Sequence, residues 1–365
     1  MSKSLKKFFS EPLDVQWRTA VLRLPRMVPD QVLRITSYEG PHPFVLKLPS
    51  RGTYSIPVYV FVPSTEPPPD GYPVILDFHG GGFVMGSCLE QAPFCAKMAR
   101  ELNAIVITVD YRMGPIDKFP AAVEDGEDVL SAILDPDMLG FAVLRAGIAT
   151  NVKPAGRPVP IDITRLALAG FSSGGNLALN LALSLDPPQV DTPWPSRIPT
   201  DHPRRIPVLL YYPSFDARQL PSERTLPPKM PASKTFWRES FDILHQTYLP
   251  RELAAHPRAS PGLADISALH DKARVYLVLP EMDSLAEQSE AWVEKVKAEG
   301  REKDLKVTRV KGMRHGWTQM PVSWLNDEEK RTRDETFRTA VRFVKDAWDG
   351  PEVDAAAMGN TRTAA

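Results

Sequence analysis

The chain has 365 residues and a formal net charge of −1, from 44 lysines and arginines against 45 aspartates and glutamates. Hydrophobic residues make up 43% and charged residues 24%, values that are typical of globular proteins with a sizeable core. The near-neutral balance excludes the electrostatic footprint of a nucleic-acid-binding or membrane-surface protein. No apolar run reaches the ~20 residues of a membrane span, and the basic N-terminal stretch lacks the apolar segment of a secretory signal.

The cysteine count constrains the cross-links and the compartment. Cys88 and Cys95 are the only cysteines, seven residues apart on one predicted helix. Two helical turns separate them by about 10 Å, whereas a disulfide needs Cα atoms within about 7 Å. We therefore expect no disulfide and no four-ligand zinc site, and a reducing, cytoplasmic setting.

Strand-like and helix-like runs alternate along most of the chain. Short apolar runs rich in β-branched residues and bounded by turn residues predict strands, and longer runs with helical periodicity predict helices. In chain order the main predicted elements are two strands within residues 44–62, a strand at 73–80, a helix at 88–103, a strand at 104–112, a helix at 119–134, a strand at 165–172, a helix at 174–185, and strands at 206–214, 273–283 and 305–312.

This alternation predicts an α/β fold with a mainly parallel central sheet that helices cover on both faces. Ligands of such sheets bind at the carboxyl ends of the strands. Two stretches bring no strand of their own, and we expect them to form a helical cap, or lid, above the sheet. The predicted division is cap at residues 1–43 and 215–257, core at 44–214 and 258–350, and a frayed tail at 351–365. Within the core, residues 135–160 lack sustained periodicity and are predicted to be an insertion.

Residues 170–174, Gly-Phe-Ser-Ser-Gly, match the pattern Gly-x-Ser-x-Gly between a predicted strand and a predicted helix. The pattern is typical of a sharp turn that lifts a nucleophilic serine off the end of a strand. The helix N-terminus there also directs backbone donors at a developing oxyanion. A plain Gly/Ser turn is the alternative for the pattern alone, but its strand–turn–helix context favours Ser172 as a nucleophile.

A second glycine motif, His79-Gly-Gly-Gly-Phe83, follows the predicted strand at residues 73–78. Three consecutive glycines cost backbone entropy, so a plain loop seldom needs them all. They are useful where backbone N–H groups point into a site, and this pattern is typical of the second half of an oxyanion hole. We assign His79 to shaping the loop and not to proton transfer.

Ser172 is a weak nucleophile unless a base takes its proton. In the chain order that accompanies the serine motif, the base follows the nucleophile. His315 comes directly after the last predicted strand, in a Gly-Met-Arg-His-Gly-Trp segment that permits a tight loop, so we predict it as the base. The remaining histidines do not share that position: His42, His79, His202, His245, His256 and His270.

An acid at a neighbouring strand end would orient such a histidine by accepting its Nδ1 proton. Asp283 closes the predicted strand at 273–283, and Glu281 lies two residues earlier. We prefer Asp283 and keep Glu281 as the alternative. Glu287 is expected on the solvated face of the next helix.

Taken together, these motifs resemble the hormone-sensitive lipase-like branch of the α/β-hydrolase superfamily. The resemblance runs over residues 57–316 and rests on four blocks: HGGGF at 79–83, VDYR with FPAAVED at 109–125, GFSSGGN at 170–176, and PEMD with HGW at 280–317. It implies the α/β-hydrolase fold with a cap, and the triad Ser172, Asp283 and His315. It also implies an oxyanion hole made by the backbone N–H groups of Gly81, Gly82 and Ser173.

The chain departs from the usual family pattern at several positions. Phe171 and Ser173 flank the nucleophile, where the family often has aspartate and alanine, and Met113 follows the DYR block. These departures bear on the substrate and not on the triad. Asp110 and Arg112 of the DYR block are structural in the family, and we expect a buried ion pair there.

The resemblance implies a serine hydrolase that cleaves carboxylic esters of small or medium size through an acyl-enzyme, with short acyl chains preferred. The alternatives are a lactonase, thioesterase or acyltransferase with the same triad, and a non-catalytic module that binds a small molecule. No cofactor and no metal are expected, nor nucleic acid or stable membrane insertion; a homodimer stays open. The candidate substrate-binding residues are Phe83, Phe171, Trp317, Trp237 and Tyr248.

Overall fold

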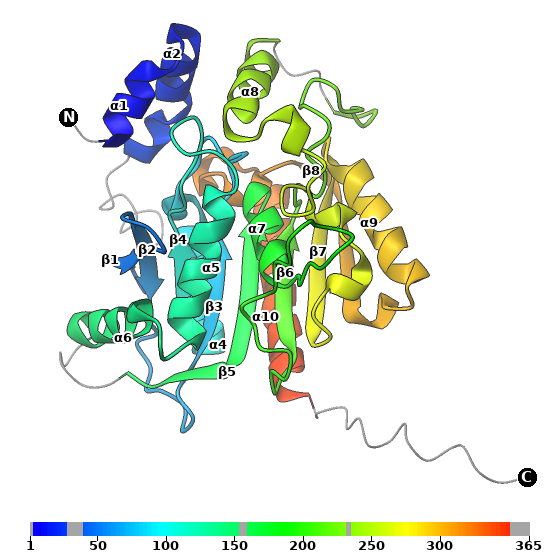
Figure 1. The fold of residues 1–365 in the computed structure, drawn as a ribbon. Helices are drawn as coiled ribbons and strands as arrows, with labels where there is room; N and C mark the ends of the chain where they lie inside the picture. The colour runs from blue at the N-terminus through cyan, green and yellow to red at the C-terminus, as the bar shows by residue number, and fades with distance from the viewer. Residues whose placement is uncertain (1–2, 28–38, 153–158, 231–234, 351–365) are drawn as a thin grey trace, which may run out of the picture.

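The computed structural model of the chain describes residues 3–27, 39–152, 159–230 and 235–350. The predicted tail at 351–365 lies outside the described residues. Eight strands form one sheet in the order β1-β2-β4-β3-β5-β6-β7-β8 (Figure 1). The strands are β1 (Phe44–Pro49), β2 (Ser55–Phe61), β3 (Tyr72–Phe78), β4 (Ile105–Val109), β5 (Ile161–Phe171), β6 (Ile206–Tyr211), β7 (Ala273–Met282) and β8 (Leu305–Arg314).

The sheet is parallel from β4 to β8, and only the pairs β1–β2 and β2–β4 are antiparallel. Every residue of β3, β4 and β6 is buried, as their continuous apolar runs predict for strands covered on both faces. The α/β-hydrolase fold with a mainly parallel sheet is therefore confirmed.

Helices cover both faces of the sheet, and each face has its own hydrophobic core. On one face lie α4 (Ala92–Leu102) and α10 (Asp327–Asp349). On the other lie α5 (Ala121–Leu134), α7 (Ser173–Leu181) and α9 (Ala286–Ala298). Among the described residues, no helix combines the length and hydropathy that crossing a membrane requires.

The predicted insertion at residues 135–160 contains the helix α6 (Leu139–Asn151), which its weak periodicity did not indicate. Its buried residues, Gly140, Leu144 and Ile148, repeat every four positions and pack against α5 and β1. Gly140 permits this close packing, since a Cβ there would lie 2.7 Å from the Cβ of Ala132. A stripe of only three buried residues is a weak periodic signal.

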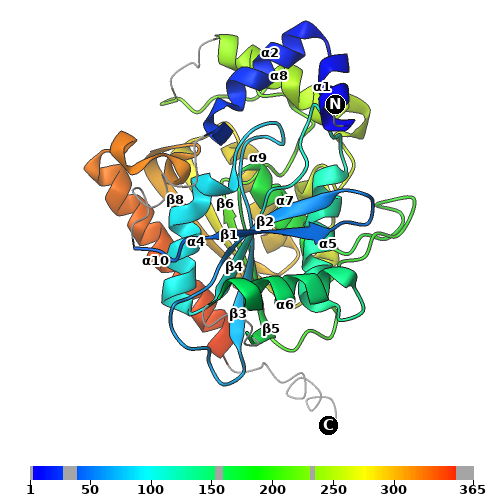
Figure 2. The same cartoon turned by 90° about the vertical axis from the view of Figure 1, so that its left-hand side faces the viewer.

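The two segments predicted to form a cap lie together beyond the carboxyl ends of the strands (Figures 1 and 2). The N-terminal segment contains α1 (Lys3–Ser10), α2 (Leu13–Leu22) and the short 3-10 helix η1 (Leu24–Met27). The later segment contains α8 (Thr235–Tyr248), which packs against α2. Arg18 of α2 donates to the hydroxyl of Ser240 in α8 at 2.5 Å. We use the name cap for these two segments, and the domain boundaries themselves stay a prediction.

Candidate active site

Ser172 stands at a strained turn between β5 and α7. Its φ of 54° and ψ of −115° put a non-glycine residue in a region that L-residues rarely occupy. Neighbouring backbone fixes the turn, because the N–H of Ser172 donates to the carbonyl of Tyr211 at 2.9 Å and its carbonyl accepts from the N–H of Ser214 at 3.1 Å. The side chain is thereby held at the carboxyl end of the sheet.

The glycines around Ser172 are required by close backbone contacts. A Cβ at Gly170 would lie 2.0 Å from the carbonyl oxygen of Gly174. A Cβ at Gly174 would lie 2.1 Å from the carbonyl oxygen of Phe78, at the end of β3. The Gly-x-Ser-x-Gly pattern therefore marks a place where β3, β5 and the start of α7 touch through their backbones.

The structure brings the three predicted triad residues together. His315 Nε2 lies 3.0 Å from Ser172 Oγ, and His315 Nδ1 lies 2.8 Å from Asp283 Oδ2. The other oxygen of Asp283 accepts from the N–H of Leu285 at 2.8 Å. Asp283 is 2% exposed and the side chain of His315 is 33% exposed, so the carboxylate is enclosed while the imidazole borders solvent.

Strand register explains how residues 283 and 315 meet. Met282 pairs with Arg314 in the parallel β7–β8 ladder, and the N–H of His315 donates to the carbonyl of Met282 at 3.2 Å. Asp283 and His315, the residues that directly follow this pair, therefore lie next to each other at the end of the sheet. Glu281, the alternative acid, instead accepts from the N–H of Gly312 at 2.8 Å and from Lys229 at 2.9 Å.

The sequence analysis did not single out Tyr212, which supports the base. This residue follows β6, the strand between β5 and β7, and has a φ of 39°. Its ring meets the imidazole of His315 edge-on, with centroids 4.8 Å apart. Its hydroxyl bonds Thr318 and donates to Gln319 at 3.2 Å. A tyrosine with positive φ has no reliable sequence signature, since only the preceding apolar strand is visible there.

The HGGG loop lies beside Ser172 because β3 and β5 are neighbours, with Phe78 paired to Gly170. Gly81 has a φ of 125° and Gly82 a φ of 62°, both in the region that favours glycine. Within the described ranges, the N–H groups of Gly81 and Gly82 donate to no other residue. Ser173, the third predicted donor, opens α7 and is fully buried.

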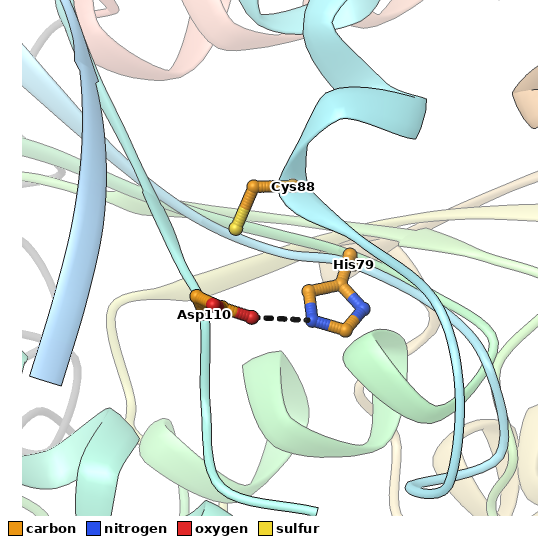
Figure 3. A group of neighbouring side chains, drawn as sticks. All are labelled: His79, Cys88 and Asp110. Atoms are coloured by element: carbon orange, nitrogen blue, oxygen red, sulfur yellow. Dashed lines mark ion pairs between the residues drawn. The ribbon is translucent and has the colours of Figure 1, made fainter. Parts of the chain in front are cut away.

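His79 has a structural position beneath this loop. Its Nδ1 donates to the carbonyl of Gly80 at 2.7 Å, and its ring stacks on Tyr111 with centroids 4.3 Å apart. Burial lowers the pKa of His79 to about 4, so the imidazole is neutral at physiological pH. Figure 3 shows the other nitrogen facing Asp110, at 3.9 Å from Oδ1.

His79, Cys88 and Asp110 place one potential ligand atom each within 4.8 Å of one another (Figure 3). The environment does not suit a cation, because Asp110 Oδ1 already accepts from the guanidinium of Arg26 at 2.5 Å. Burial also raises the pKa of the Cys88 thiol well above its usual value, so the thiolate form is disfavoured. Asp110 is thus the partner of Arg26 in the cap, and these three residues give no reason to assign a metal.

The predicted ion pair between Asp110 and Arg112 is wrong, since each residue has another partner. Asp110 pairs with Arg26 of η1. Arg112 pairs with the buried Asp125 at 2.8 Å and with Glu124 at 3.2 Å, both on α5. The two charges of the DYR block therefore hold different elements, the cap on one side and α5 on the other.

The aromatic residues proposed to bind substrate divide into two groups. Phe171 and Trp317 belong to the hydrophobic core on the α4–α10 face, and Phe171 stacks on Tyr211 with centroids 4.5 Å apart. Both side chains are buried, so the structure does not support substrate contact by either. Phe83 and Tyr248 stack on each other, with centroids 4.6 Å apart, where the cap meets the core. They are buried as well, at 5% and 1% exposed, so the structure does not support substrate contact by these two either. The side chain of Trp237, on α8, lies outside the described residues.

Comparison with known proteins agrees with this architecture. The family model described as alpha/beta hydrolase fold (Abhydrolase_3) matches residues 75–319. An AB hydrolase superfamily protein of Schizosaccharomyces pombe is 28% identical over 262 residues, which cover 69% of this chain and 66% of that protein. Carboxylesterase NlhH of Mycobacterium tuberculosis is 29% identical over 258 residues, which cover 68% of this chain and 67% of that enzyme. The chain thus spans about two thirds of these relatives.

Solved structures share the fold over most of the chain. EstE1, a thermostable carboxylesterase cloned from a metagenomic library, superposes with a TM-score of 0.62 at 25% identity, covering 86% of this chain and 95% of that one. An esterase from Pyrobaculum calidifontis superposes with a TM-score of 0.64 at 23% identity, covering 89% and 93%. With the family match over residues 75–319, the chain belongs to the alpha/beta hydrolase fold family.

Proposed function

We propose that this protein is a serine hydrolase that cleaves carboxylic esters of small or medium size through an acyl-enzyme intermediate. The observation that carries the proposal is the position of His315, whose two ring nitrogens lie 3.0 Å from Ser172 Oγ and 2.8 Å from Asp283 Oδ2. A base in contact with both a hydroxyl and a buried carboxylate is the arrangement that activates a serine. The names of the relatives, carboxylesterase and esterase, support the same substrate class.

In the proposed mechanism each of these residues has a step. Ser172 Oγ attacks the ester carbonyl while His315 Nε2 takes its proton, and Asp283 keeps the imidazole in the tautomer that carries its proton on Nδ1. The backbone N–H groups of Gly81, Gly82 and Ser173 stabilise the oxyanion. His315 then protonates the leaving alcohol, and a water molecule repeats the cycle to release the acid.

A fluorophosphonate probe and a set of p-nitrophenyl esters test this proposal. We expect the wild-type protein to be labelled and to turn over short acyl chains faster than C12 or longer chains, whereas Ser172→Ala abolishes both labelling and turnover. Ser64→Ala, at an exposed loop serine, is the control that retains both. An unlabelled wild-type protein that hydrolyses no ester would support the non-catalytic binding module instead.

Lactones and thioesters in the same panel address the alternatives. A lactonase, a thioesterase or an acyltransferase would use the same triad, so only relative turnover separates them. We expect esters to be the best substrates. The cytoplasmic setting inferred from the two cysteines and the open question of a homodimer stay predictions.

A further inference from the structure

Two arginines of the N-terminal cap segment contact the loop that follows the HGGG motif. Arg23, which ends α2, donates from Nε to the carbonyl of Val84 at 3.0 Å and from Nη2 to the carbonyl of Gly114 at 2.6 Å. Arg26, in η1, donates from Nη1 to the carbonyl of Gly86 at 2.5 Å. Its Nη2 bonds Asp110 Oδ1 at 2.5 Å.

The loop they contact is a tight turn with unusual backbone geometry. Gly81, Gly82 and Phe83 have consecutive positive φ values of 125°, 62° and 63°. Inside the turn, the N–H groups of Val84 and Met85 both donate to the carbonyl of Gly81, at 3.2 and 3.0 Å. Such a conformation persists only where surrounding structure restrains it, because one of the three residues is not glycine.

The arginines supply restraint from outside the turn. The carbonyls of Val84 and Gly86 flank Met85 and accept from different guanidinium groups. Gly114 is tied to the same loop, since its N–H donates to the carbonyl of Phe83 at 3.0 Å while its own carbonyl accepts from Arg23. The N-terminal cap segment therefore holds the loop through two arginines, one at Val84 and one at Gly86.

The choice of partners indicates that backbone positioning is the purpose. In the described ranges, Arg23 forms no ion pair, and both of its side-chain bonds go to main-chain carbonyls. The partly buried guanidinium of Arg23 bonds only carbonyl oxygens, although a hydrogen bond to a carboxylate would be stronger. These bonds are explained if the role of Arg23 is to hold the loop in place.

We propose that Arg23 and Arg26 are positioning residues for the reaction: they hold the loop so that the N–H groups of Gly81 and Gly82 face the developing oxyanion. The inference rests on the proposed function, because it takes those two groups as the oxyanion donors. The N-terminal segment then contributes to the chemical step and does not merely shield the site. Catalysis depends on contacts between residues 23–26 and a loop some sixty positions later in the sequence.

A matched set of variants tests this role. Arg23→Ala removes the hydrogen bonds to the carbonyls of Val84 and Gly114 and leaves every carboxylate with its partner. Arg26→Ala is the second variant. Lys7→Met is the control, because Lys7 joins the same cap segment to Asp117 at 2.9 Å without touching the loop. Steady-state kinetics with p-nitrophenyl acetate then give kcat and KM separately, and thermal unfolding reports stability.

For Arg23→Ala we expect kcat to fall by about 10- to 100-fold with KM within about two-fold, because losing one oxyanion donor outright costs about 10²–10³ in kcat. Methylguanidinium added to this variant should restore part of kcat, and should leave the control unchanged. A purely structural role would lower the unfolding temperature without this rescue and without a selective effect on kcat.

The outcomes separate the inference from the function on which it rests. If wild type hydrolyses esters but the kcat of Arg23→Ala equals that of Lys7→Met, the positioning role is refuted while the proposed function stands. A change confined to KM refutes it equally. If Arg23→Ala is unfolded at the assay temperature, Arg23→Lys is measured in its place. A kcat of Arg23→Lys that lies between that of wild type and the rate without enzyme supports the role, and a kcat equal to that of wild type overturns it. A wild-type protein without esterase activity overturns both.

Discussion

Asp77 offers a stability prediction whose size follows from its burial. The residue lies on β3, directly before Phe78 and His79, and is 0% exposed. Its Oδ2 accepts from the thiol of Cys95 at 3.5 Å, while Oδ1 has no partner in the described part of the chain. Burial raises the pKa of Asp77 from 3.8 to about 7.

The sign of the effect follows from proton binding. Between about pH 4 and pH 7 the folded chain keeps a proton on Asp77 that the unfolded chain releases, so this group makes the free energy of unfolding fall as pH rises. Each unit of pKa corresponds to about 1.4 kcal/mol, and the full shift to roughly 4 kcal/mol. Above about pH 7 Asp77 is ionised in the folded chain as well, so its effect on the free energy of unfolding no longer changes with pH.

Asp77→Asn removes the titration, so we expect the variant to gain stability relative to wild type as pH rises. The difference in the free energy of unfolding should grow by about 3 kcal/mol between pH 5 and pH 8. Urea denaturation followed by tryptophan fluorescence at several pH values measures it. Asp70→Asn, at an exposed loop position, is the matched control for replacing one aspartate by asparagine. Parallel pH dependences for wild type and Asp77→Asn would refute the reasoning.

Three further predictions concern the site. Gly170→Ala should lower kcat/KM by about 10²-fold, since its Cβ would lie 2.0 Å from a carbonyl oxygen of α7, whereas Gly52→Ala, with 4.0 Å of room, should leave activity and unfolding temperature unchanged. Asp283→Asn should lower kcat by about 10⁴-fold with little change in stability, because the imidazole takes the wrong tautomer. Burial raises the pKa of the Cys88 and Cys95 thiols well above normal, so Ellman's reagent should label neither in the native protein and both after denaturation.

The side chains of the predicted triad could be located from the sequence because each stands where a local pattern ends. The turn at Ser172 needs small neighbours, and the glycines that supply them are visible without any long-range information. Asp283 and His315 were identified as polar residues directly after apolar strand runs, and parallel register then carries them to one edge of the sheet. The alternation of elements was sufficient for the fold.

Side-chain direction was the weaker part of the prediction. Phe171 is one of the predicted substrate-binding residues, yet successive residues of a strand point to opposite faces, and its ring packs into the core. Trp317 is also predicted to bind substrate, but its side chain packs into the same core. Its closeness to His315 in the sequence does not determine which side of the loop the side chain occupies. Strand alternation would have corrected the first of these assignments.

Ion-pair and hydrogen-bond partners outside the motifs could not be predicted from the sequence. Asp110 and Arg112 are two residues apart and of opposite charge, so an ion pair between them was the economical hypothesis, but one pairs with the cap and the other with α5. A guanidinium that bonds carbonyls, as Arg23 does, leaves no trace in the pattern of charged residues, because any residue supplies a carbonyl. Motifs therefore identify the candidate catalytic groups by residue type. The residues that contact the loops carrying these groups are defined by their position and become visible only in the folded chain.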